Sequence, residues 1–247
     1  MTLSDQAVAQ FAEQGFLRVD RLTSEIEVRS LCAVYDRLFE PTAAVAAGDR
    51  VELATSDDGS RATLPQILNP DHYAPELLDS DAYRGATALA RQLLGSEAEY
   101  MGMHAIRKPA LDGAETPWHQ DEAYWDPAYD HPAISVWMPL QPVDEANGCM
   151  EFVPGSHRGD VRRHRLAQAD ADGLVLDDAA AEAGVANAVA CPLPAGGATV
   201  HAARTLHHAG PNRTAEPRRA LIMAFRSPPT LRTDGRAFPW QPARWYA

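Results

Sequence analysis

The spacing of apolar residues changes near residue 98. Before that point apolar side chains recur every three or four residues, which is typical of amphipathic helices. From Tyr100 onward, short apolar or alternating runs are separated by Pro, Gly and Asn, which is typical of strands and turns. Helices followed by many short strands predict an α+β chain with a mainly β core, in which helices buttress an antiparallel sandwich or jelly roll.

Three segments of the first part carry helix signals: residues 4–14, 24–39 and 80–94. Ser4 and Ser80 stand where a capping side chain begins a helix, and Gly95 supplies a stop. Ser24 and Glu27 have the spacing of a capping box, in which the two residues cap each other's backbone N–H groups.

The remaining segments are expected to be strands, turns and loops. Residues 15–20 predict a turn followed by a strand, and the polar segment 42–63 predicts an irregular surface stretch. The Ala- and Asp-rich stretch 168–188 predicts an insertion loop or a short helix between strands. Five further runs have strand character: residues 101–106, 133–140, 150–153, 198–201 and 220–225.

The length of 247 residues is enough for one domain with a buried core. We expect a single domain over residues 1–247, with a mostly helical part (1–98), a jelly-roll core (99–230) and a C-terminal extension (231–247). A composition of 45% hydrophobic and 23% charged residues is ordinary for a globular protein and unlike that of a disordered chain or a fibre.

The net charge of −12 disfavours nucleic acid and anionic membrane surfaces as partners. The arginine-rich run 158–165 is expected to be a solvated loop, so the partner we expect is a small-molecule substrate. Oligomeric state is not predicted.

Cysteine usage predicts a reducing environment such as the cytoplasm. Cys32, Cys149 and Cys191 are widely spaced and form no CxxC pair, so neither a disulfide framework nor a thiolate zinc site is indicated. The first residues lack the basic start and apolar run of a signal peptide, and no apolar stretch approaches the length of a membrane span.

His119 and Asp121 form the first candidate for metal chemistry. They lie two residues apart in a strand-like segment, so both side chains project from the same face of the chain. A distant second histidine would complete a facial triad of two histidines and one carboxylate, which suits iron(II) and leaves neighbouring positions open. An H-x-D triplet alone is weak evidence, because chance occurrences are frequent.

His207 and Arg218 strengthen this candidate. His207 precedes a Gly-Pro-Asn turn, and Arg218 begins an apolar strand eleven residues later. A turn and return strand can bring the guanidinium back beside the metal. Because its planar fork binds a carboxylate bidentately and stays charged, Arg218 can grip the distal carboxylate of 2-oxoglutarate.

These residues resemble the phytanoyl-CoA dioxygenase family, iron(II)- and 2-oxoglutarate-dependent oxygenases built on a cupin-like double-stranded β-helix, or jelly roll. The resemblance covers most of the chain and is strongest in three segments: Pro117-Trp118-His119-Gln120-Asp121, residues 147–157 and residues 207–218. Their order and mutual spacing make the combination more specific than any one piece.

The resemblance implies roles for particular residues. His119, Asp121 and His207 correspond to the iron ligands and Arg218 to the carboxylate anchor, with His208 as the nearest rival to His207. Further co-substrate contacts, at matching or gapped positions, fall on three residues: Trp137, His104 and Gln66. Ala209 stands where the family usually has a hydroxyl residue, so one hydrogen bond to the co-substrate is expected to be missing.

Other histidines and aromatic residues have plainer expectations. His157, His201 and His208 are expected to be structural, the last two as core or rim histidines with satisfied ring nitrogens. The aromatic segment 124–129 is placed to line the substrate mouth, and residues 240–246 are expected to cover the barrel or to mediate a subunit contact.

The resemblance implies iron(II), 2-oxoglutarate and O₂ as cofactor and co-substrates. The expected reaction is hydroxylation of an unactivated C–H bond in a small metabolite or natural-product intermediate, with release of succinate and CO₂. Asp121 argues against halogenation, because related halogenating oxygenases carry a small residue there. Desaturation, cyclisation or epimerisation, a non-oxidative jelly-roll metal hydrolase or isomerase, and a metal-containing binding module without turnover are the alternatives.

Overall fold

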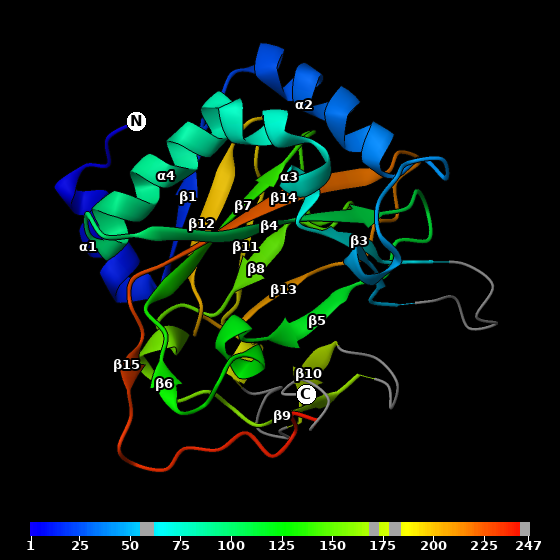
Figure 1. The fold of residues 1–247 in the computed structure, drawn as a ribbon. Helices are drawn as coiled ribbons and strands as arrows, with labels where there is room; N and C mark the ends of the chain where they lie inside the picture. Colours follow the sequence, from blue (N-terminus) through cyan, green and yellow to red (C-terminus); the bar gives the residue numbers. More distant parts are fainter. Residues whose placement is uncertain (55–61, 168–172, 178–183, 243–247) are drawn as a thin grey trace.

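Two antiparallel sheets face each other, and helices cover the outer face of the larger one (Figure 1). The computed structural model describes residues 1–54, 62–167, 173–177 and 184–242. In these residues the helices are α1 (Asp5–Gln14), α2 (Glu25–Leu38), α3 (Pro70–Tyr73) and α4 (Asp81–Leu94), with 3₁₀ turns η1 (Ala47–Asp49), η2 (Pro75–Asp79), η3 (Asp121–Tyr124) and η4 (Ser156–Arg158).

The described strands form two main sheets and two small ribbons. The large sheet has the order β1 (Phe16–Val19), β12 (Ala198–Ala202), β7 (Ala133–Pro139), β14 (Arg218–Arg226), β4 (Glu99–Lys108), β3 (Pro65–Leu68) and β2 (Arg50–Glu52). The small sheet has the order β11 (Val189–Cys191), β8 (Met150–Phe152), β13 (His207–Ala209) and β5 (Thr116–His119). The ribbons pair β10 (Leu174–Leu176) with β9 (His164–Leu166), and β15 (Thr230–Leu231) with β6 (Tyr129–Asp130).

Alternation along the strands divides the interior into two layers. On β7, Ile134, Val136 and Met138 point outward into the apolar layer beneath the helices, whereas Trp137 points inward between the two sheets. Strands β12 and β14 divide their residues in the same way. The helices are therefore held by the outer face of the large sheet, and the space between the sheets contains a second apolar cluster beside the polar inward-facing residues.

The predicted jelly roll with its helical buttress agrees with this architecture. Ser4, Ser24 and Ser80 all cap helices through side-chain oxygens that accept backbone N–H bonds, and Gly95 follows the end of α4. None of the helices in the described part of the chain combines the length and the apolar character needed to cross a bilayer.

The capping-box prediction is wrong in its second half. Ser24 accepts from the backbone N–H of Glu27, but the Glu27 carboxylate turns away and caps the start of α4. Its two oxygens accept the N–H groups of Asp81 at 2.6 Å and Ala82 at 2.9 Å. The orphan donors at the start of α4 and the positive end of its dipole attract the carboxylate more strongly than its own helix does.

The prediction for residues 42–63 is also wrong in part. Residues 50–52 form β2, the edge of the large sheet, with Val51 opposite Gln66. This strand is short and held by backbone pairing, so the hydrophobic pattern carries no sign of it. Within the stretch 168–188, the described residues include strand β10, while 168–172 and 178–183 lie outside the described residues.

The Glu27 cap joins α2 to α4, so we expect Glu27→Ala to lower the free energy of unfolding by about 1–2 kcal/mol, the usual effect of losing a cap and a favourable helix-dipole charge. Urea unfolding of the purified protein measures this. Glu25→Ala, at an exposed position in the same helical turn, is the matched control and should change the value by less than about 0.5 kcal/mol. Equal effects of the two substitutions would contradict the proposed cap.

Candidate metal centre

Three potential metal ligands meet between the two sheets. Strand β13 pairs antiparallel with β5, which places His207 directly opposite His119, and Asp121 begins the η3 turn just after β5. One ligand atom from each residue lies within 4.8 Å of those of the other two. The Nε2 atoms of His119 and His207 lie 3.6 Å and 3.4 Å from Oδ1 of Asp121.

Backbone carbonyl groups fix which ring nitrogen of each histidine faces the shared space. His119 Nδ1 lies 2.7 Å from the Pro117 carbonyl oxygen, and His207 Nδ1 lies 2.8 Å from that of Thr205. Because a carbonyl only accepts, both Nδ1 atoms donate, and both Nε2 atoms keep a free lone pair. This is the arrangement that metal-ligating histidines adopt.

His207 and Asp121 hold the protonation states that a metal needs. Burial, together with nearby His119 and His201, lowers the pKa of His207 to about 4, so its ring is neutral in neutral solution. Burial by itself would raise the pKa of Asp121, but His207, His119 and His201 outweigh this effect and hold it well below its usual value. Two neutral imidazoles and one carboxylate fit iron(II).

The segment between the first two ligands is tied to the loops around it. Gln120 is buried; its amide donates to the Arg204 carbonyl at 2.7 Å and accepts from the Arg162 N–H at 2.8 Å. Ser135 on β7 donates its hydroxyl to Oδ2 of Asp121 at 2.8 Å. The strand that carries His119 ends at that residue, so these bonds take over the positioning of Asp121.

Arg218 is a buried cation without an anionic partner among the described residues. It begins β14 on the inward face, is 1% exposed, and its Nε and Nη1 atoms have no hydrogen-bond partner in the described structure. Its guanidinium carbon lies 5.4 Å from the ring centre of Trp137. Burial lowers the pKa of Arg218 to about 10, so the group stays charged in neutral solution.

Lys108 and Asn212 hold the connection between His207 and Arg218 in place. The buried Lys108 amine donates to the carbonyl oxygens of Ala209 at 2.8 Å and Gly210 at 2.6 Å. The Asn212 amide donates to three carbonyl oxygens, among them those of Lys108 and Glu216. These bonds fix the turn between His207 and Arg218, which the eleven-residue spacing predicted.

His104 and Gln66 lie together on the inward face of neighbouring strands β4 and β3. The Gln66 amide nitrogen is 3.2 Å from His104 Nδ1. The His104 side chain is reached by solvent, yet burial lowers its pKa. His104 is paired with Ile222, which packs against the cluster between the sheets, so His104 and Gln66 face the space between the sheets.

His208 points to the opposite side of β13 from His207. Its ring stacks on Trp118 at 5.0 Å and lies near Glu115 and Glu151 on the outer side of the small sheet. It is not one of the three grouped ligands, so the geometry favours His207 over this rival. Tyr124, from the aromatic segment after the ligands, lies with its ring 6.2 Å from that of His119.

The expectation that His201 is a satisfied core histidine is wrong. It is 2% exposed, but neither ring nitrogen has a hydrogen-bond partner. It lies on β12, opposite Ser135, with its ring centre 4.3 Å from that of His207. Sequence reasoning missed it because its nearness to the ligands comes from strand pairing rather than local spacing.

The C-terminal segment packs against the turn that carries Asp121. Glu122 is 1% exposed and accepts two bonds from Arg204 and one, at 2.7 Å, from Arg236. The Trp240 indole donates to the Ala123 carbonyl at 3.0 Å. Trp240 therefore covers this part of the barrel, which is one of the two roles expected for residues 240–246. Residues 243–247 lie outside the described residues.

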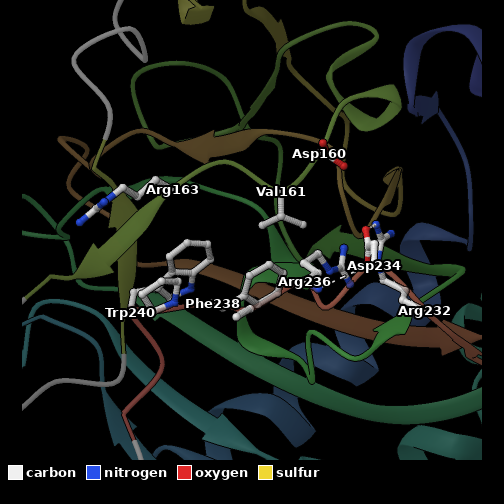
Figure 2. Close-up of a pocket in the computed structure, with 10 residues that line it drawn as sticks. Asp160, Val161, Arg163, Arg232, Asp234, Arg236, Phe238 and Trp240 are labelled. Atoms are coloured by element: carbon white, nitrogen blue, oxygen red, sulfur yellow. Dashed lines mark hydrogen bonds and ion pairs between the residues drawn. The ribbon is translucent and has the colours of Figure 1, made fainter.

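A cavity of about 420 Å³ lies between this segment and residues 160–163 (Figure 2). Phe238 and Trp240 are stacked on one side of it, and Val161 lies across from them. The ring of His164 lies 5.4 Å from that of Trp240, which lines the cavity, and Nε2 of His164 accepts the N–H of Gln120 beside the metal-binding turn.

His164 is buried in its neutral form: Nδ1 donates to the Arg162 carbonyl, Nε2 accepts from Gln120, and burial followed by nearby His119 lowers its pKa to about 4. The unfolded chain protonates this histidine near pH 6.5, so the free energy of unfolding falls as the pH drops from 6.5 towards 4.

We expect His164→Gln to reduce this loss of stability between pH 6.5 and pH 5 by about 2 kcal/mol, measured by urea unfolding of metal-free protein. Identical pH slopes for the two proteins would show that His164 does not cause the loss.

Comparisons with known proteins identify the family of the chain. Residues 11–220 match the family model described as phytanoyl-CoA dioxygenase (PhyH). The crystal structure of EvdO2 from Micromonospora carbonacea var. aurantiaca, complexed with 2-oxoglutarate, is 40% identical, covers 98% of both chains and superposes with a TM-score of 0.84.

Curated relatives match over a shorter stretch. The ectoine dioxygenase of Bordetella parapertussis is 33% identical over 163 residues, which are 63% of this chain and 50% of that protein. The L-proline trans-4-hydroxylase of Streptomyces griseoviridis is 30% identical over 155 residues, or 56% of this chain and 58% of that protein. The chain thus spans about half the length of the curated relatives it matches. Because the family model covers most of the sequence, the chain belongs to the phytanoyl-CoA dioxygenase family.

Proposed function

We propose that this protein is an iron(II)- and 2-oxoglutarate-dependent oxygenase that hydroxylates a C–H bond of a small metabolite. The observation that carries the proposal is the pairing of two features: the His119, Asp121 and His207 cluster, and the buried, unpartnered guanidinium of Arg218. The first suits iron(II), and the second suits the distal carboxylate of a dicarboxylic co-substrate.

The ligand set leaves room for the co-substrates. Iron(II) bound by two histidines and one carboxylate keeps adjacent positions open for 2-oxoglutarate and O₂, and together they oxidise a substrate C–H bond with release of succinate and CO₂. The roles of the chain are to hold the three ligand atoms together, to bind the co-substrate and to keep His207 neutral.

Arg218 supplies the anion site. An unpaired charge buried this deeply is unfavourable by several kcal/mol, and a carboxylate that accepts from Nε and Nη1 would remove that penalty. Trp137 forms a wall beside the guanidinium, and we assign Gln66 and His104 to further contacts with the co-substrate. Ala209 offers no hydroxyl, so we expect no side-chain hydrogen bond to the co-substrate from this position.

The proposed substrate is a small natural-product intermediate or an amino-acid-like metabolite. Two relatives are named for small molecules of this kind, ectoine and L-proline. The net charge of −12 disfavours nucleic acid and membrane partners. Cys32, Cys149 and Cys191 are all unpaired, which supports the cytoplasm as the proposed location.

We expect anaerobic addition of iron(II) and 2-oxoglutarate to the wild-type protein to give the weak visible charge-transfer band of the metal chelate, and His119→Ala to abolish it. Admission of air should then yield succinate. No band in the wild-type protein would contradict the proposal, whereas metal-dependent turnover without O₂ or 2-oxoglutarate would point to a hydrolase or isomerase.

A second prediction separates Arg218 from its neighbour. Arg218→Met should weaken 2-oxoglutarate binding at least about 30-fold, or about 2 kcal/mol, because it removes the charged partner of a buried carboxylate. Titration of the chelate band measures this. Arg219→Met is the matched control, since Arg219 faces outward and pairs with Asp36 at 2.7 Å. Equal weakening by both substitutions would remove Arg218 from the anion site.

A further inference from the structure

His201 is a polar side chain enclosed in the protein without a visible function. It is 2% exposed, and both of its ring nitrogens lack a hydrogen-bond partner among the described residues. A buried N–H left without an acceptor is unfavourable. One of the two nitrogens carries a hydrogen in the neutral ring, so the position calls for an acceptor nearby.

Asp121 offers that acceptor. His201 Nε2 lies 3.4 Å from Oδ2 of Asp121, the same oxygen that accepts the Ser135 hydroxyl at 2.8 Å. Ser135 and His201 are direct partners on neighbouring strands β7 and β12, so both approach the carboxylate from the large sheet. The ring of His201 is also packed between those of Phe152 and His207, which limits its rotation.

The two oxygens of Asp121 therefore face different surroundings. Oδ1 is the oxygen near Nε2 of His119 and Nε2 of His207, on the small-sheet side. Oδ2 is turned toward Ser135 and His201 on the large-sheet side. His201 does not belong to the cluster of three ligands, so its place is behind the carboxylate rather than on the metal.

We propose that His201 is a positioning residue: it donates from Nε2 to Oδ2 of Asp121 and, with Ser135, leaves only Oδ1 for the metal. A carboxylate held in this way would bind the metal through one oxygen only, so its second oxygen would not occupy a further coordination position on the metal. That position is then kept for the co-substrates. This inference rests on the metal-dependent function proposed above.

The test uses Co²⁺ binding to the full-length metal-free protein, followed by visible absorption. His201→Phe keeps a ring of similar size but removes both nitrogens. We expect it to weaken Co²⁺ binding 10- to 100-fold, the usual effect of losing such a supporting group, and to change the intensity of the d–d bands because Asp121 becomes free to chelate. His201→Gln, which restores a donor, should recover most of the affinity.

Metal binding separates positioning from packing. If His201 only filled the core, His201→Phe, which keeps the ring volume, would leave Co²⁺ affinity and the d–d bands unchanged. Loss of a donor to Asp121 should instead weaken Co²⁺ binding in a variant that still folds, which the melting temperature of the metal-free protein verifies. Ser135→Ala acts on the same oxygen and should weaken Co²⁺ binding about tenfold, so the test does not depend on one variant.

Thr199→Val is the matched control. Thr199 is buried on the same strand and the same face, two residues from His201 and opposite Trp137, and its substitution should leave Co²⁺ affinity and spectrum unchanged. Wild-type spectra and affinity in both His201→Phe and Ser135→Ala would overturn the positioning role alone. Failure of the wild-type protein to bind Co²⁺ would overturn the proposed function, and this inference with it.

Discussion

The site depends on the register of β13 between its two neighbours. His207 stands opposite His119 on β5 and opposite Phe152 on β8, and a slip of one residue would turn His208 inward in its place. The strand has three residues, so its own pairing supplies little resistance to a slip. Contacts at both ends of the strand provide the resistance to a slip in register.

Those contacts connect the metal site to both ends of the chain. Before His207, the Thr205 hydroxyl donates to the Gly15 carbonyl at 2.8 Å. Gly15 has φ +82°, and a Cβ there would lie 2.3 Å from a ring nitrogen of His157, so no larger residue allows this approach. After His207, the Lys108 amine donates to the carbonyl oxygens of Ala209 and Gly210 at the other end of the strand. Separately, Arg236 reaches Glu122, the neighbour of Asp121. The helical and C-terminal parts thus stabilise the geometry of residues to which they contribute no ligand.

Two basic side chains lie in the interior near the site, although the molecule as a whole carries a negative charge. The chain carries a net charge of −12, yet Lys108 and Arg218, partners on neighbouring strands, place two cationic side chains in its interior. Burial and the nearby Arg218 lower the pKa of Lys108 well below its usual value. Lys108 uses its hydrogens on two carbonyl groups, and Arg218 keeps donors for an external anion. Screening over about 8–10 Å in physiological salt lets this local field act on a small anion despite the acidic surface.

The sequence predicts the parts of the site that depend on local spacing. His119 and Asp121 are two residues apart, and His207 and Arg218 flank a recognisable turn. The sequence pattern therefore identifies these residues directly. His201, Glu27 and Glu122 differ because their partners lie far along the chain and are brought near only by strand pairing and helix packing. The short edge strand β2 was missed for the same reason, since backbone pairing rather than side-chain pattern makes it a strand.

The pairing of β1 with β12 has a consequence for synthesis. Phe16 lies opposite His201, so β1 has its only described sheet neighbour some 185 residues later in the chain. Neither strand can enter the sheet co-translationally until most of the chain has emerged, and contacts of such long range slow folding. Until β12 has been made, Phe16, Leu17 and Val19 lack their native sheet partner, and an apolar strand left unpaired in this way is prone to non-native contacts.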